Sequence, residues 1–104
     1  SLTLPFMSVG AQGVISVASN VAPREVATMV RAFAKGDTKK ALAIHQKLYP
    51  LFKDLFIETN PVPVKAALAM LGLIDEEYRL PLVQMSAANR ATLKAAMKAA
   101  GVLK

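Results

Sequence analysis

The sequence predicts a mostly helical chain that carries one strand of a parallel α/β sheet. The strand is expected at residues 13–18, a short run between a glycine turn and Ser19-Asn20. Its apolar groups point to both faces, as in a strand buried on both sides of a parallel sheet, and they come from Val14, Ile15 and Val17. No second strand is evident elsewhere. Because buried backbone N–H and C=O groups need partners, we expect the neighbouring strands in another chain or in a missing part of the same one.

Helical patterns lie on both sides of the strand. A short helix is predicted over Leu2–Val9 with Thr3 as its cap, and Asn20 is placed to cap a second helix that Gly36 ends. The order of helix, glycine turn, strand and helix is that of an α/β unit. Residues 1–36 are therefore predicted to be one such unit.

Residues 37–104 are predicted to form a separate helical part. Asp37 is placed to cap a long helix, and Pro50 inside that helix should kink it because proline removes one helix hydrogen bond. Residues 73–85 read as an irregular crossing segment, and Ser86 is placed to cap the last helix.

Composition limits the classes of protein. The chain of 104 residues has no cysteine, which excludes disulfides and thiolate metal sites and fits a reducing, cytoplasmic compartment. The longest apolar run, Ala66–Ile74, is about half of the roughly 20 residues that a membrane span needs, so no membrane partner is expected. The net charge is +6, but the basic residues are scattered and only Lys39-Lys40 are adjacent. This pattern favours solvated helix faces over nucleic-acid binding.

The stretch Asn60–Lys65 is the second informative feature. Its two prolines should force extended geometry on Asn60 and Val62 and lead into a helix over Val64–Leu71. Lys65 would then lie in the first turn, where a cation is neutral or unfavourable. We expect a structural tether from Lys65 to a carboxylate or carbonyl, rather than a Schiff-base nucleophile.

No other side chains combine into a catalytic site. His45, the single histidine, has no carboxylate three or four residues away, so it is expected to be a packing or surface residue and not a metal ligand. Asp75-Glu76-Glu77 are contiguous and cannot converge as an acid/base pair, which predicts a solvated loop. No phosphate loop, glycine-rich fingerprint or serine elbow is present, and no cofactor is expected.

The end of the predicted strand offers a conditional site. If the strand belongs to a (β/α)8 barrel, its C-terminal end faces the active site. Backbone groups around Ile15 and Ser16 could then bind a substrate carboxylate without a catalytic side chain. The alternative is that these residues are only barrel core.

Three stretches together resemble the dihydrodipicolinate synthase family of pyruvate-dependent lyases. Gly10–Val17 is similar to the family's eighth barrel strand, and Asn60–Lys65 resembles its Asn-Pro-x-Pro-(Val/Ile)-Lys signature. Arg79–Leu82, ahead of a final helix that ends in Gly101–Leu103, completes the match. The resemblance covers the whole chain and corresponds to about the C-terminal third of such an enzyme.

The resemblance implies a homotetrameric (β/α)8 TIM barrel with C-terminal helices. The family condenses pyruvate, held as a Schiff base on a lysine, with aspartate semialdehyde in lysine and diaminopimelate biosynthesis. It implies that the Ile15 backbone lies against the pyruvate carboxylate and that Phe6–Val9 takes part in the weaker tetramer contact. It also implies an architectural motif at Asn60, Pro61, Pro63 and Lys65. The Schiff-base lysine and catalytic tyrosine belong to earlier sequence, so this chain alone is expected to be inactive.

A different class of function is the alternative. The chain could be a free-standing helical interaction module that self-associates through its orphan strand. The first hypothesis predicts that the strand pairs with parallel strands of the same enzyme, and the second predicts self-association without any other polypeptide.

Overall fold

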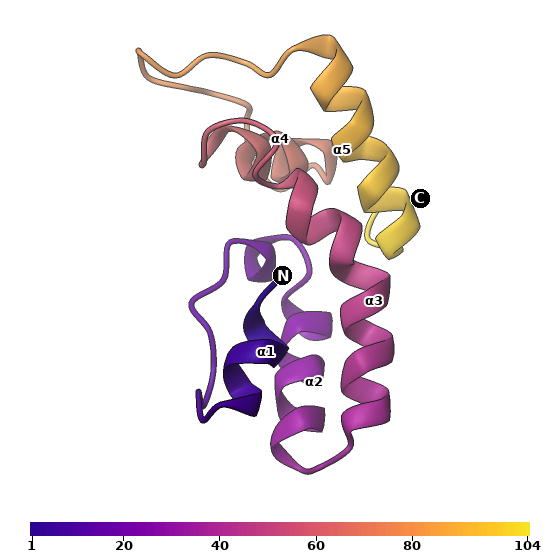
Figure 1. Ribbon diagram of the computed structural model, residues 1–104. Helices are drawn as coiled ribbons and strands as arrows, with labels where there is room; N and C mark the ends of the chain where they lie inside the picture. Colours follow the sequence, from indigo (N-terminus) through magenta and orange to yellow (C-terminus); the bar gives the residue numbers. More distant parts are fainter.

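The structure is a computed structural model that describes all 104 residues, and it is helical throughout (Figure 1). It contains five α-helices and one short 3-10 helix, which are α1 (Thr3–Ser8), η1 (Ala18–Asn20), α2 (Pro23–Ala34), α3 (Thr38–Asp54), α4 (Val62–Met70) and α5 (Ala87–Ala100). None of these helices is both long enough and apolar enough to cross a membrane.

The strand predicted at residues 13–18 is absent from this structure. Residues 11–16 have no regular secondary structure, and Ala18 already belongs to η1. The backbone groups of residues 12–16 make no backbone hydrogen bond to the rest of the chain. A strand exists through its ladder of hydrogen bonds to a neighbour. The sequence has the composition of a strand, but the chain supplies no neighbour for it.

The starts of the first two long elements differ from the prediction. Thr3 lies inside α1 and does not cap it, and the residue before α2 is Ala22 rather than Asn20. The Asn20 side chain instead donates to the Val17 carbonyl, at 3.0 Å, which holds η1. Pro23 begins α2, where its missing N–H costs nothing because the first helical N–H groups have no partner in the helix.

The ends of α3 and α5 confirm the predicted caps. The Asp37 carboxylate accepts the Lys40 backbone N–H at 3.1 Å, and the Ser86 hydroxyl accepts the Asn89 backbone N–H at 3.3 Å. Pro50 lies inside α3 as predicted. The expected extended geometry at Val62 is wrong, because Val62 is the first residue of α4 and its following proline sits in the tolerant first turn.

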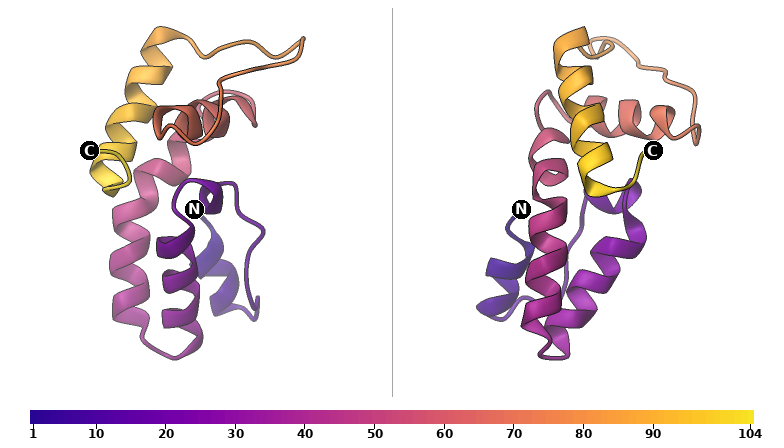
Figure 2. Two further views of the ribbon diagram at one scale, coloured as in Figure 1. Left: turned by 180° about the vertical axis from the view of Figure 1, so that it is seen from behind. Right: turned by 90° about the vertical axis from the view of Figure 1, so that its right-hand side faces the viewer.

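One apolar core joins the whole chain. It contains 17 buried residues that run from Ala18 to Ala100, and α3 lies between α2 on one side and α5 on the other (Figure 2). Residues 1–36 and 37–104 therefore share a core, and the domain boundary between them stays a prediction.

The molecule is more open than a compact protein of its mass. It is elongated, with extents of 42 × 27 × 21 Å, and exposes 6529 Å² of accessible surface. A compact protein of 11.1 kDa would expose about 5,700 Å². Part of the exposed surface is apolar, since large side chains such as Phe6, Ile15 and Leu80 have no cover within this chain.

Candidate functional site

Ile15, the predicted substrate contact, belongs to residues 11–17, here called the open segment. It leaves α1 through Gly10 and runs beside that helix without regular structure (Figure 1). The Ile15 side chain is fully exposed, at 106% of its reference area, and Val14 is 43% exposed. Ile15 therefore presents both its backbone and its side chain outward, and the alternative that it is buried core does not hold within this chain.

The C-terminal end of the open segment is fixed by two serines. The Ser19 backbone N–H donates to the Ser16 hydroxyl at 3.3 Å, and the Ser19 hydroxyl donates to the Ser16 carbonyl at 2.6 Å. These bonds turn the chain into η1, whose Ala18 is buried in the core. One end of the open segment is thus anchored while its middle is free.

An apolar cavity of about 230 Å³ lies beside the open segment. Its walls come from the open segment, from α1 and from the C-terminal part of α3, and they include Leu2, Phe6, Val14, Ile15, Phe52 and Phe56. No Asp, Glu, Lys, Arg or His side chain lines it. The cavity suits apolar side chains of a covering element, and its walls carry no acidic or basic side chain.

Lys65 is held as the sequence predicted. Its ammonium group donates to the Glu77 carbonyl and lies 5.3 Å from the centre of the Tyr78 ring. A cation over an aromatic face is attracted to the ring's negative surface. The tether to a carbonyl is confirmed, and it joins the signature stretch to the loop that follows α4.

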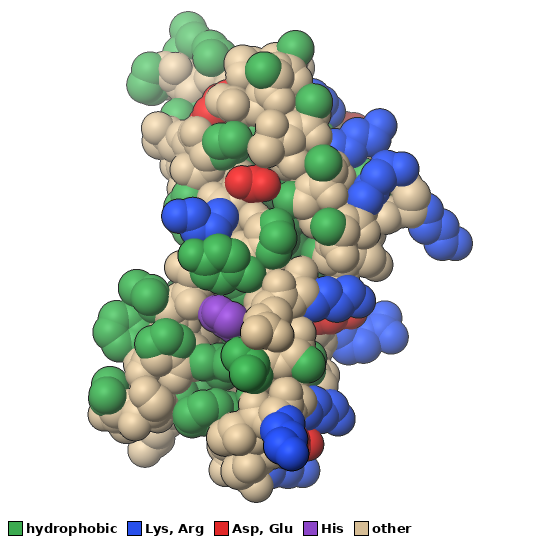
Figure 3. Space-filling model, turned by 45° about the vertical axis from the view of Figure 1, so that its right-hand side comes forward, with side chains coloured by type: hydrophobic (Ala, Val, Ile, Leu, Met, Phe, Trp, Pro, Cys, Tyr) green, Lys and Arg blue, Asp and Glu red, His purple; other side chains and the backbone are tan.

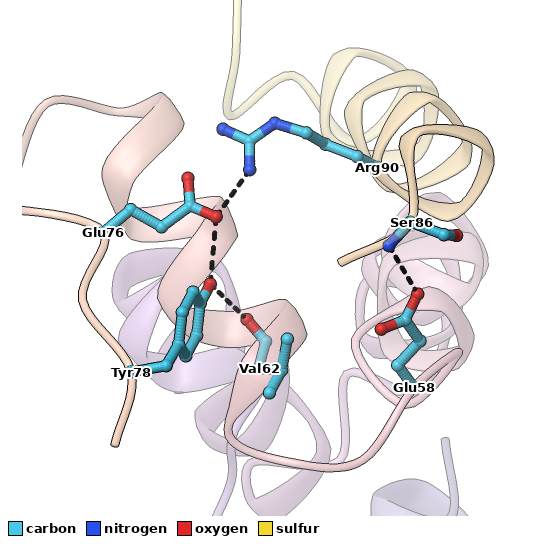
Figure 4. A network of polar contacts seen from close by, with 6 residues as sticks. All are labelled: Glu58, Val62, Glu76, Tyr78, Ser86 and Arg90. Carbon is cyan, nitrogen blue, oxygen red and sulfur yellow. Dashed lines mark hydrogen bonds and ion pairs between the residues drawn. The ribbon is translucent and has the colours of Figure 1, made fainter. Parts of the chain in front are cut away.

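Glu76 lies at the centre of a polar network (Figure 4). Its carboxylate accepts from the Arg90 guanidinium at 2.6 Å and from the Tyr78 hydroxyl at 3.0 Å. The same hydroxyl is 3.3 Å from the Val62 carbonyl. Burial, followed by the hydrogen bond and charge of Glu76, raises the pKa of Tyr78 to about 12. The expectation of a solvated acidic loop is wrong for Glu76, whose side chain is 14% exposed because it pairs with α5.

Glu58 makes a second connection to α5. Its carboxylate accepts the Ser86 backbone N–H at 3.1 Å and the Asn89 side-chain amide at 2.8 Å (Figure 4 draws the first). The Asn89 bond, with the backbone bond from Ser86, lowers the pKa of Glu58. Together, the contacts of Glu58, Lys65, Glu76, Tyr78 and Arg90 form what we call the polar clamp, which fixes α4, α5 and the loop between them.

Nothing in the chain forms a metal centre. No group of three or more His, Cys, Asp or Glu side chains lies close enough to hold an ion. His45 packs against the rings of Tyr49 and Phe52, with centroid distances of 5.8 and 5.9 Å, and burial lowers its pKa. The sequence predicted a packing or surface residue, and the structure shows that His45 packs.

The polar clamp was missed by sequence reasoning. Glu58 lies 28 residues before Ser86, and Glu76 lies 14 before Arg90, so neither pair has a local spacing. One signal was present. The cap at Ser86 is followed three residues later by Asn89, not by the glutamate of a capping box, so the Ser86 N–H lacks the local acceptor that a capping box would give it.

Comparison with known proteins identifies the family. Residues 1–100 match the Dihydrodipicolinate synthetase family. The 4-hydroxy-tetrahydrodipicolinate synthase of Aquifex aeolicus is 56% identical over 98 residues, which cover 94% of this chain and 33% of the relative. The enzyme of the same name from Endomicrobium trichonymphae is 50% identical over 104 residues and is covered to 36%.

Solved structures agree with this assignment. The crystal structure of dihydrodipicolinate synthase from Aquifex aeolicus matches with a TM-score of 0.92 and 53% identity, over 97% of this chain and 34% of that one. The synthase from Methylacidiphilum fumariolicum SolV matches with a TM-score of 0.94 and 56% identity, over 96% and 33%. The chain spans about a third of the length of the relatives it matches. It belongs to the dihydrodipicolinate synthetase family.

Proposed function

We propose that this chain acts as the C-terminal part of a 4-hydroxy-tetrahydrodipicolinate synthase and completes its (β/α)8 barrel. The observation that carries the proposal is the open segment. Its backbone between residues 12 and 16 makes no backbone hydrogen bond, and Val14 and Ile15 expose β-branched side chains. Parallel neighbours on both sides would satisfy these backbone groups and cover these side chains, so the segment would then become the barrel's eighth strand.

In this proposal the chain contributes a substrate contact and no nucleophile. The backbone of Ile15 would lie against the carboxylate of pyruvate, because an N–H group at the C-terminal end of a barrel strand is placed to donate to an anion there. The lysine that forms the Schiff base with pyruvate, and the site for aspartate semialdehyde, would lie outside these residues. Lys65 is already engaged with the Glu77 carbonyl and the Tyr78 ring, which supports a structural role for it.

Two further roles belong to the same proposal. The motif residues Asn60, Pro61, Pro63 and Lys65 would be architectural, which is supported by the burial of Pro63 and by the tether from Lys65. The segment Phe6–Val9 would take part in a tetramer contact. Phe6 and Val9 are 59% and 81% exposed, which leaves apolar surface available there.

A fusion protein tests the proposal directly. The whole chain is joined to the part of the Aquifex aeolicus relative that lies outside the matched third, and the fusion is incubated with pyruvate and borohydride. We expect a pyruvyl adduct by intact mass and condensation with aspartate semialdehyde. The chain alone should show neither, since it supplies no Schiff-base lysine.

Variants of the fusion separate the roles of individual residues. Ile15→Pro removes the backbone N–H, so it should raise the KM for pyruvate, while Ile15→Val keeps the N–H and should not. Lys65→Met should still trap pyruvate. A folded fusion that traps no pyruvate would contradict the proposal, and an adduct on the chain alone would overturn the structural role of Lys65. Reversible self-association of an inactive fusion would favour the free-standing interaction module.

A further inference from the structure

The loop between α4 and α5 projects from the body of the molecule, and we call residues 73–86 the arm (Figure 1). The polar clamp fixes both of its ends. On the outgoing side, Lys65 holds the Glu77 carbonyl and Glu76 pairs with Arg90. On the returning side, Glu58 accepts the Ser86 N–H. The foot of the arm is therefore positioned by α4, α5 and the turn between α3 and α4.

The tip of the arm is free of such contacts. Its one backbone hydrogen bond runs from the Leu82 N–H to the Arg79 carbonyl, at 3.0 Å. Leu80 is 86% exposed and Val83 is 62% exposed. Large apolar side chains held outward on a fixed base are typical of a binding loop, because a rigid scaffold positions the loop residues that meet a partner.

The arm and the open segment lie on the same side of the molecule. Both extend to the left of α3 in Figure 1 and to the right of it in the reversed view of Figure 2. Figure 3 shows Lys and Arg side chains gathered along the opposite edge. One large apolar body could thus meet the arm and the open segment together, while the basic edge stays in solvent.

We propose that the tip of the arm, through Leu80 and Val83, is a second docking point for the body that covers the open segment. That body is the part of the synthase barrel outside this chain, so the inference rests on the proposed function. About two thirds of each relative's length lies outside the part that this chain covers. We call this contact between the arm tip and the rest of the barrel the clasp. It would fix the C-terminal helices to the barrel at a point remote in sequence from the eighth strand.

A second copy of this chain fits the surface less well. The open segment has the composition of a strand buried between two neighbours. The chain has no strand of its own, so a second copy could offer only its own open segment on one side. The remainder of a barrel offers a strand on each side and an outer surface for the arm.

Hydrogen exchange on the fusion with the Aquifex aeolicus relative tests the clasp. We expect the amides of residues 12–16 and of the arm tip, residues 79–84, to exchange slowly in the fusion and rapidly in the chain alone at concentrations too low for self-association. Protection of 12–16 without protection of the tip overturns the clasp and leaves the proposed function standing. Protection of neither segment overturns both. Protection of the tip that is lost on dilution assigns the arm to a second copy and also overturns the clasp.

A charge placed at the tip provides the matched test. Leu80→Asp with Val83→Asp should raise exchange at the tip by about tenfold or more, since burying a leucine or valine side chain contributes at least that factor. Ala91→Asp with Ala95→Asp puts the same charges on exposed positions of α5 and should leave the tip protected. Equal effects of the two pairs, or no effect of the first, would contradict the clasp while pyruvate trapping still reports on the proposed function.

Discussion

Glu58 makes the attachment of α5 sensitive to acid. Its carboxylate bridges the Ser86 N–H and the Asn89 amide, and these bonds lower its pKa. A lowered folded pKa means that the stabilisation is complete above the ordinary carboxyl pKa and is lost as pH falls through the folded value. In Glu58→Gln the side chain still accepts hydrogen bonds but no longer titrates.

We therefore expect the wild-type chain to lose more stability than Glu58→Gln between about pH 5 and about pH 3. Urea unfolding followed by circular dichroism at each pH measures the difference. If the stability of the two proteins falls equally over this pH range, Glu58 does not carry the effect. Glu25→Gln is the control, because Glu25 lies in α2 and is absent from the polar clamp.

Lys65→Met should destabilise the chain by about 2 kcal/mol. The substitution keeps the length of the side chain and removes a charged hydrogen bond to the Glu77 carbonyl and the contact with the Tyr78 ring. Lys94→Met is the matched control, since Lys94 is an exposed helical lysine without an ion pair. Urea denaturation of both variants checks the expectation, and equal midpoints would count against the tether.

At the scale of elements, the end of α5 depends on one glycine. Gly101 has φ of 76°, and a Cβ built there would meet Lys47 Nζ at 3.2 Å. Gly101→Ala should cost about 1 kcal/mol, because an L-residue is strained in the left-handed region. Gly13→Ala is the control in the isolated chain, since Gly13 has open space and no positive φ. The thermal unfolding midpoint should fall in Gly101→Ala and not in Gly13→Ala. An unchanged midpoint in Gly101→Ala would show that the end of α5 is frayed and does not contribute to stability.

Local signals were enough to predict most helix ends but not their long-range attachments. Asp37 and Ser86 cap their helices through the N–H three residues on, a spacing that is visible in sequence. Asn20 has the same chemistry but was misassigned, because the chain inserts η1 and binds Asn20 to the Val17 carbonyl first. The bond from Glu58 to Asn89 spans 31 residues, and no local pattern specifies it.

At the scale of the whole molecule, the isolated chain should self-associate. Its accessible surface exceeds that of a compact protein of the same mass by roughly 800 Å², and large apolar side chains, among them Phe6, Ile15 and Leu80, are exposed. Sedimentation velocity should show a concentration-dependent shift. Val14→Lys with Ile15→Lys should weaken it by about tenfold, because charges disfavour burial of the open segment. Leu42→Lys, on an exposed position of α3, should have little effect.

The same scale shows where sequence reasoning stopped. The β-branched residues at positions 14, 15 and 17 predicted a strand, and the helical patterns predicted the helices but not the single core that α3 shares with α2 and α5. A strand also requires neighbours, which no property of residues 13–18 can supply. The composition thus predicted a strand, and the structure of this chain contains none.

Tyr78 gives this protein a built-in optical label. The chain has no tryptophan and two tyrosines, and Tyr49 lies on α3, away from the arm. The phenol of Tyr78 is bonded to a carboxylate, an arrangement that quenches tyrosine emission, and Tyr49→Phe would leave it as the sole fluorophore. In the isolated chain, fluorescence lifetimes of that variant would then report, without any added dye, whether the foot of the arm is closed.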